Sequence, residues 1–223
     1  MAGKIYEQNA ITPAQDAVLG MVAPGSSVLE VGCAIGFVTR ILTEQMGCKV
    51  TAVEIDEYQA SQAKPYAAHM IVGDIEDPLT WQRIAGEFDY VVFGDVLEHL
   101  KDPWEALRRA KRVLSADGCV LCSIPNVAYY RIRLKLLLGK FEYKQFGILD
   151  DTHLRFFTSH TARELFVRAG YRVCEFRAVN FRHWEGKLLP LSTGAFATQF
   201  VIKAKPEARA GDLPEDNERP KVG

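Results

Sequence analysis

The sequence predicts an α/β fold, a doubly wound seven-stranded sheet that is mostly parallel with an antiparallel last strand and has helices on both faces. Short apolar runs alternate with amphipathic segments along most of the chain, which is the pattern of parallel strands joined by helices. The last two apolar runs have no helix between them, and their connection is rich in turn formers. We therefore expect the final strand to reverse direction and lie at the edge of the sheet.

The first half of the chain carries clear start and stop signals. Thr12-Pro13 begins a helix that Gln15 completes as a capping box and that ends near Val22. Apolar and β-branched residues predict strands at 27–31, 49–54, 69–72 and 89–93. Helical spacing predicts helices at 37–46, which Gly47 ends, at 57–66 and at 79–85.

The second half continues the alternation until the last strands. Asp102-Pro103 begins a helix whose apolar face runs to Leu114. A strand at 119–124 follows, then a long segment, 125–158, with one basic and apolar helix near 128–138. A helix at 159–169 precedes strands at 171–179 and 197–203. From Pro206 onward, three prolines and eight charged residues in 18 positions predict a disordered tail, 206–223.

Length and charge limit the classes of protein. The 223 residues suffice for one core, so we expect a single domain over 1–205. A net charge of −1 disfavours a nucleic-acid partner. No apolar run predicts stable membrane insertion or a signal peptide, so we expect a cytoplasmic protein. Cys119 and Cys122 have zinc-like spacing, but residues three apart on a strand point to opposite faces, and no metal is expected.

The ends of four successive predicted strands carry residues suited to a nucleoside. Ligands of such sheets bind beyond the carboxyl ends of the strands. Glu54 can accept hydrogen bonds from a ribose diol, and Asp74 from an adenine amino group, while Asp95 can meet an amino-acid group. Small residues in the first turn let the backbone approach the ligand. The candidate cofactor-binding residues are Glu30, Gly32, Cys33, Ala34, Gly36, Glu54, Ile55, Gly73, Asp74, Ile75, Gly94 and Asp95.

A nicotinamide-dependent oxidoreductase is the alternative for this pattern, because it also uses a glycine turn and an acid after the second strand. Its third glycine would fall at Phe37, where a large ring obstructs close packing of helix and strand. That alternative also gives no reason for Gly73-Asp74. The sequence therefore favours a nucleoside ligand without a pyrophosphate.

Several motifs resemble those of class I S-adenosylmethionine-dependent methyltransferases. Val28-Leu-Glu-Val-Gly-Cys-Ala-Ile-Gly36 resembles their first motif, with Ala34 where glycine is usual. The segment from Asp89 to Pro103 resembles ubiquinone-biosynthesis-like members, and Ser123–Val127 with Asp151–Thr158 resembles a bacterial small-molecule subgroup. The resemblance covers residues 25–205 and implies a Rossmann-like fold, S-adenosylmethionine as cofactor and a small-molecule acceptor such as a sugar, a glycan precursor or a secondary metabolite.

Methyl transfer to a hydroxyl usually needs a base, and His99 and His153 are the candidates. His99 has an alternative role as a structural histidine in a turn. His153 lies in 125–158, which the resemblance makes an acceptor-side insertion or lid. A non-catalytic methyltransferase-like domain remains a further alternative, and the sequence leaves the oligomeric state open.

The acceptor-side segment is basic and aromatic. The candidate substrate-binding residues are Tyr129, Tyr130, Arg131, Arg133 and Arg155. One hypothesis is a lid that recognises an anionic acceptor. The alternatives are a solvated basic face above an apolar helix side and docking on a membrane surface. Tyr6 is a further candidate, as a cap over the cofactor.

Overall fold

The computed structural model describes residues 10–179 and 194–207. The proposed cap at Tyr6 lies outside these residues. So do residues 208–223, which are nearly all of the predicted tail, 206–223. Within the described chain, no helix combines the length and the apolar character that crossing a membrane requires.

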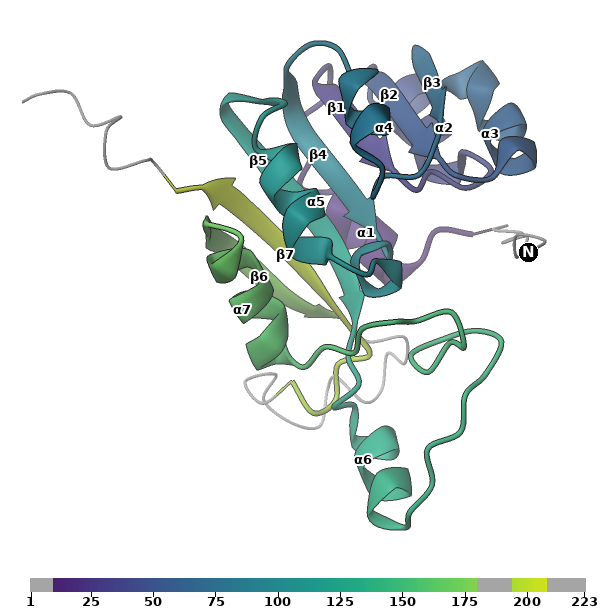
Figure 1. The fold of residues 1–223 in the computed structure, drawn as a ribbon, viewed down its shortest axis with the longest axis vertical. Coiled ribbons are helices and arrows are strands. Elements are labelled where there is room, and N and C mark those ends of the chain that lie inside the picture. The colour runs from purple at the N-terminus through teal and green to yellow at the C-terminus, as the bar shows by residue number, and fades with distance from the viewer. Residues whose placement is uncertain (1–9, 180–193, 208–223) are drawn as a thin grey trace, which may run out of the picture.

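A seven-stranded sheet forms the centre of the molecule, with the order β3-β2-β1-β4-β5-β7-β6 (Figure 1). The strands β1 to β5 run parallel, and β7 runs antiparallel to both β5 and β6. The strands are β1 (Ser27–Val31), β2 (Lys49–Glu54), β3 (His69–Val72), β4 (Phe88–Gly94), β5 (Leu114–Pro125), β6 (Tyr171–Val179) and β7 (Gln199–Pro206). The mixed sheet with an antiparallel last strand is thus confirmed.

The position of the last strand in the sheet differs from the expectation. The strand β7 lies between β5 and β6, so β6 and not β7 forms the edge. Its residues Val201 and Ile202 are completely buried, whereas Tyr171 is the one buried residue of β6 and the rest of that strand is partly or fully exposed. A strand that is apolar on both faces lowers the free energy most in the interior of a sheet. The strand also extends through Pro206, one residue past the predicted domain end.

Helices cover both faces of the sheet, as predicted. One face packs against α1 (Pro13–Leu19), α2 (Phe37–Arg40) with the π-helical turn η1 (Ile41–Gln45), and α3 (Glu57–Ala63) with the 3-10 turn η2 (Lys64–Tyr66). The other face packs against α4 (Pro78–Gln82), α5 (Pro103–Ala110) and α7 (Ser159–Arg168). Cys119 and Cys122 belong to these two different cores, which confirms that they point to opposite faces.

The predicted helix caps are present. Thr12 Oγ1 accepts from the backbone of Gln15 at 3.2 Å, and the Gln15 side chain accepts from Thr12 N at 2.9 Å. Asp102 caps α5 by accepting from Glu105 N at 2.9 Å. These caps satisfy amide groups that the first turn of a helix leaves without partners.

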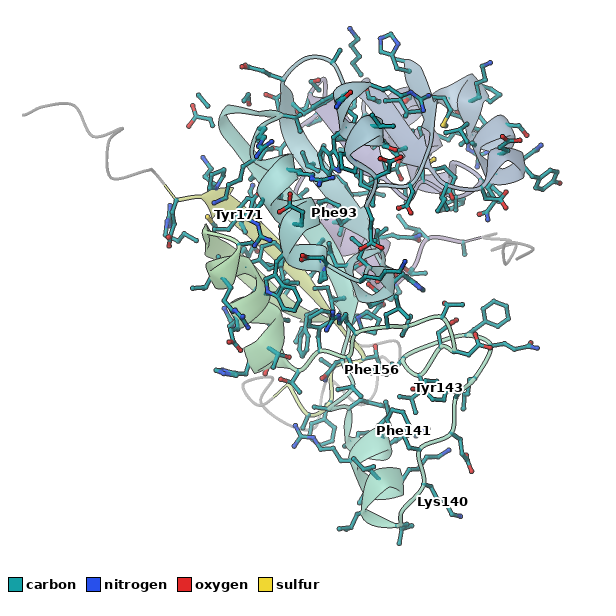
Figure 2. All side chains as sticks on the ribbon, in the orientation of Figure 1. Phe93, Lys140, Phe141, Tyr143, Phe156 and Tyr171 are labelled. Carbon is teal, nitrogen blue, oxygen red and sulfur yellow. The ribbon has the colours of Figure 1, made fainter. Side chains whose placement is uncertain are left out.

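The helix α6 (Tyr130–Leu137) projects beyond the carboxyl end of β5, apart from the other helices (Figure 1). The side chain of Ile132 is buried, but Leu134, Leu136 and Leu137 are exposed. Of the apolar side expected beneath a basic face, Ile132 therefore packs against Tyr129 and Leu149, and the three leucines do not pack against the described part of the chain. The labelled rings of Phe141, Tyr143 and Phe156 gather beside this helix (Figure 2).

Candidate functional site

The turn after β1 has the backbone conformation that small residues permit. Gly32 and Gly36 have φ angles of 71° and 83°, and Ala34 has a φ of 49°. The Ala34 backbone thus adopts the left-handed conformation at the position where glycine is usual, which costs roughly 1–2 kcal/mol. Cys33 is buried, and desolvation together with the nearby Glu30 raises the pKa of its thiol.

The carboxylate of Glu54, at the end of β2, is held by three backbone amides. Its Oε2 accepts from Ala34 N at 2.8 Å, and its Oε1 accepts from Ile55 N at 2.9 Å and Asp56 N at 3.0 Å. Glu54 therefore connects the turn after β1 to the end of β2. A carboxylate has about four lone-pair sites, so capacity remains for a ligand hydroxyl.

Glu30 lies beneath this turn and not at its surface. It is 5% exposed, and its Oε2 accepts from Thr39 Oγ1 at 2.6 Å. Desolvation raises the pKa of Glu30 to about 7, the Thr39 hydrogen bond opposes the shift, and the Glu54 carboxylate adds to it. The geometry gives Glu30 a supporting contact to α2.

Replacing Glu30 with Gln is expected to flatten the dependence of stability on pH. Between pH 4.5 and about 7 the folded protein keeps a proton that the unfolded chain has lost. The free energy of unfolding therefore falls as the pH rises through this window, by about 3 kcal/mol in total, and stays reduced above it. Urea unfolding between about pH 5 and about pH 8 would measure this slope in the wild type and in Glu30→Gln.

The exposed Glu44 provides the matched control, because Glu44→Gln removes a carboxylate that lies outside the core. This control should keep the slope of the wild type. An equally steep slope in Glu30→Gln would show that another group is responsible.

The end of β3 lies directly beside Glu54. Gly73 N donates to Glu54 O at 2.9 Å, which places Gly73 and Asp74 at the strand end next to β2. Asp74 is exposed, and its Oδ1 accepts from Glu76 N at 2.8 Å. Ile75 is buried, whereas the side chain of Ile55 is 65% exposed. The candidate ribose and adenine carboxylates thus follow neighbouring strands.

The end of β4 carries a carboxylate that two side chains hold in place. Asp95, which follows Gly94, has a φ of 54°, and its Oδ1 accepts from Ser123 Oγ at 2.7 Å and Gln199 Nε2 at 2.8 Å. Desolvation raises the pKa of Asp95, although both hydrogen bonds and His99 oppose the shift. Gln199 was not predicted from the sequence, but a glutamine at the start of the apolar β7 is a signal that could have identified it.

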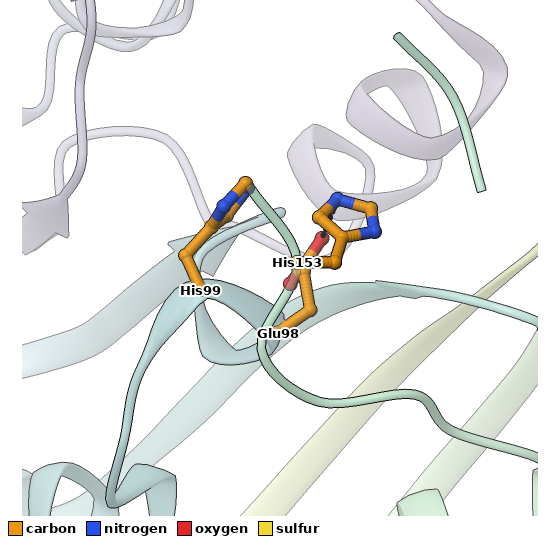
Figure 3. A group of neighbouring side chains, drawn as sticks. All are labelled: Glu98, His99 and His153. Atoms are coloured by element: carbon orange, nitrogen blue, oxygen red, sulfur yellow. Dashed lines mark ion pairs between the residues drawn. The ribbon is translucent and has the colours of Figure 1, made fainter. Parts of the chain in front are cut away.

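The two candidate bases lie together. The rings of His99, in the 3-10 turn η3 (Leu97–His99), and His153 are edge to face with centroids 4.7 Å apart. Glu98, which was not predicted from the sequence, lies beneath them, with Oε1 4.0 Å from His153 Nε2 (Figure 3). The backbone N–H groups of Leu154 and Arg155 both donate to Glu98 O at 2.9 Å, which fixes the segment of His153 against η3.

The candidate substrate-binding residues occupy different environments. Tyr129 is buried, and the ring of Tyr130 lies 5.2 Å from that of Phe196. Arg131 Nε donates to Tyr130 Oη at 3.0 Å, and Arg133 Nε donates to Ala128 O at 2.5 Å.

Arg155 is not part of α6. Its Nη2 donates to Lys101 O at 2.5 Å, and its guanidinium lies 5.4 Å from the Trp104 ring. These contacts connect the chain after His153 to the segment that precedes α5.

Known proteins match both the sequence and the fold. The family model of a methyltransferase domain matches residues 6–175. A ubiquinone biosynthesis O-methyltransferase of Caulobacter sp. (strain K31) is 29% identical over 57% of this chain and 56% of its own length. A demethylmenaquinone methyltransferase of Listeria monocytogenes (serotype 4a, strain HCC23) is 26% identical over 82% of this chain and 81% of its own.

A solved structure supports the same assignment of the fold. The magnesium protoporphyrin IX methyltransferase from Synechocystis PCC 6803, with bound S-adenosylhomocysteine, has a TM-score of 0.62 at 16% identity and covers 91% of each chain. The fold and the family match define a methyltransferase domain with a Rossmann-like sheet. The chain belongs to the methyltransferase-domain family. It spans a little over half the length of the Caulobacter relatives that it matches.

Proposed function

We propose that this chain transfers the methyl group of S-adenosylmethionine to an oxygen or nitrogen of a small-molecule acceptor. The observation that carries the proposal is the clustering of Glu54, Gly73 and the turn after β1, joined by the hydrogen bonds from Ala34 N and Gly73 N. A nucleoside placed along this edge would meet a carboxylate for its ribose and a second one, Asp74, for its base. Asp95 would then meet the amino-acid end.

The amide-bound carboxylate of Glu54 suits a ribose diol because its orientation is fixed before the ligand arrives. Binding a group that is already ordered costs less conformational entropy. The small residues Gly32 and Ala34 leave the backbone at least partly exposed, whereas Gly36 is buried against Ala63 of α3 and supports the turn from beneath. The large Phe37 ring directly after Gly36 supports a ligand without a pyrophosphate over a dinucleotide.

The chemistry requires mainly alignment, because the sulfonium donor is already activated. Holding the acceptor, methyl group and sulfur in line can contribute roughly 7–11 kcal/mol. A hydroxyl acceptor also loses a proton, and His99 and His153 lie together at the carboxyl end of β4 to handle it. Desolvation and the neighbouring His153 lower the pKa of His99, so it is neutral and able to accept a proton near neutral pH.

The acceptor we propose is a sugar, a glycan precursor or another secondary metabolite. The names of the relatives, which refer to ubiquinone and demethylmenaquinone, support a small molecule over a nucleic acid. We propose that residues 125–158 form the acceptor side of a single domain. Its Arg131 and Arg133 would contact anionic groups of the acceptor, and Tyr129, Tyr130 and Arg155 would shape that side.

The test is a comparison of ligands followed by turnover. Calorimetry should detect binding of S-adenosylhomocysteine and no binding of NAD. Labelled methyl groups should then enter a component of a metabolite extract, and Arg131→Ala or Arg133→Ala should raise the KM for that acceptor without changing cofactor affinity. Binding of NAD alone would indicate an oxidoreductase, and binding of S-adenosylhomocysteine without any turnover would indicate a non-catalytic domain.

A further inference from the structure

Three side chains with metal-binding atoms converge at the carboxyl end of β4. Glu98 and His99 come from η3, and His153 comes from the segment between α6 and α7 (Figure 3). One ligand atom from each residue lies within 4.8 Å of the other two. The residues are 55 positions apart in sequence, so it is the fold that brings them together.

Glu98 is buried in a way that its protein neighbours do not compensate. Its side chain is 1% exposed, and neither carboxylate oxygen has a hydrogen-bond partner within the part of the chain that the structure describes. Burying a polar group without a partner costs about 1–3 kcal/mol, and a charge costs more. A cation at this position would offset that cost.

Both imidazoles already have the orientation that metal-binding histidines show. His153 Nδ1 lies 3.1 Å from Ile148 O, so its N–H donates there and the lone pair is on Nε2, the nitrogen that faces Glu98. Metal-bound histidines usually donate their other N–H to a carbonyl or carboxylate in this manner.

The imidazole of His99 has the same arrangement, with the proton on Nδ1 and the lone pair on Nε2. Its Nδ1 lies 3.1 Å from Thr152 Oγ1, whose own hydrogen goes to Asp150 Oδ1 at 2.6 Å. The Thr152 oxygen therefore accepts, His99 Nδ1 carries the proton, and Nε2 carries the lone pair. A chain of hydrogen bonds from a buried aspartate thus fixes the tautomer.

We propose that Glu98, His99 and His153 bind a divalent first-row transition-metal ion of the Zn²⁺ type. Two imidazoles and one carboxylate are a ligand set of catalytic zinc sites, which keep a fourth position open. Mg²⁺ and Ca²⁺ prefer ligand sets made of oxygen alone. Ligand atoms around tetrahedral zinc lie roughly 3.3–3.5 Å apart, so the 4.0 Å between His153 Nε2 and Glu98 Oε1, and the other separations of up to 4.8 Å, must shorten when the ion binds.

The role of the ion rests on the proposed function. A hydroxyl of the acceptor that occupies the open position would lose its proton to water more readily, because the ion lowers its pKa. The oxygen would then form a bond to the methyl carbon while the carbon–sulfur bond breaks, which gives an ether and S-adenosylhomocysteine. In this arrangement the histidines act on the acceptor's proton through the ion and not as bases.

The test measures metal binding directly on the full chain. After dialysis against a chelator, titration with Zn²⁺ is expected to show one tight site per chain, confirmed by elemental analysis after removal of excess metal. Glu98→Gln and His153→Asn should each weaken Zn²⁺ binding by at least roughly 100-fold, since the loss of even a supporting contact lowers metal affinity by about 10–100-fold. His160→Asn, which changes an exposed histidine on α7, should leave it unchanged.

Two further measurements keep the outcome clear. Thr152→Val removes the hydroxyl partner of His99 Nδ1 at an exposed position and leaves only the longer contact to Thr152 O at 3.3 Å, so it should weaken Zn²⁺ binding by up to about 10-fold even if the ligand variants fold poorly. Substitution with Co²⁺ should give visible absorption typical of nitrogen and oxygen ligands in the wild type. Zn²⁺ binding that is absent, or that survives Glu98→Gln and His153→Asn unchanged, would overturn the proposal. Binding of S-adenosylhomocysteine, measured in parallel, tests the proposed function separately.

Discussion

Replacing Glu54 with Gln is expected to weaken binding of S-adenosylhomocysteine by about 100-fold, which corresponds to about 2.7 kcal/mol. A hydrogen bond to a charged group contributes roughly 1.5–3 kcal/mol, and a ribose hydroxyl would make one with the lone-pair site of this carboxylate that the three amides leave open. The substitution also turns an NH₂ group toward amides that now donate to Glu54, those of Ala34, Ile55 and Asp56. Two donors facing each other would disturb the turn after β1.

Isothermal titration with S-adenosylhomocysteine would measure this loss. Glu57→Gln is the matched control, because Glu57 is an exposed residue in the first turn of α3, three positions along the chain. The control should bind as the wild type does. If Glu54→Gln binds within a factor of about two of the wild type, the ribose does not lie against this carboxylate.

A second large effect is expected at Gly36. A Cβ atom there would lie 2.6 Å from the Ala63 Cα of α3, and the φ of 83° is one that L-residues adopt only with strain. Gly36→Ala should therefore lower the free energy of unfolding by roughly 2–5 kcal/mol, the sum of backbone strain and overpacking. Urea unfolding monitored by circular dichroism would measure the change.

Gly47→Ala separates these two causes. Gly47 has a φ of 65°, but a Cβ atom there would meet no atom of residues 10–179 or 194–207 within 4 Å. Gly47→Ala should therefore lower the free energy of unfolding by the backbone strain alone, roughly 1–2 kcal/mol. Equal losses at the two positions would mean that α3 shifts to admit the methyl group at almost no cost.

The strands and caps could be predicted from the sequence because their signals are local. Thr12 with Gln15, and Asp102 with Pro103, are recognisable within four residues. The order of the last strands was predicted wrongly because it depends on which strand hides more apolar surface. The continuous run Phe200-Val-Ile202 compared with the alternation in Tyr171–Arg177 does carry that information.

The candidate site likewise contains residues that local sequence signals predict and residues that only a long connection brings together. Glu54 and Asp74 could be predicted because each directly follows a strand, and the sheet itself brings strand ends together. The convergence of His153 with Glu98 could not be predicted. It depends on a long connection in which backbone hydrogen bonds from Leu154 and Arg155 fix one conformation, and periodicity gives no information on such a path.

The placement of β7 between β5 and β6 has a consequence for synthesis on the ribosome. Until residues 199–206 emerge, β5 has an unpaired side and β6 has no partner in the sheet. Unpaired strand edges promote aggregation while they are accessible. The nascent chain therefore completes its sheet only after β7 has been synthesised, because this one strand pairs with both β5 and β6.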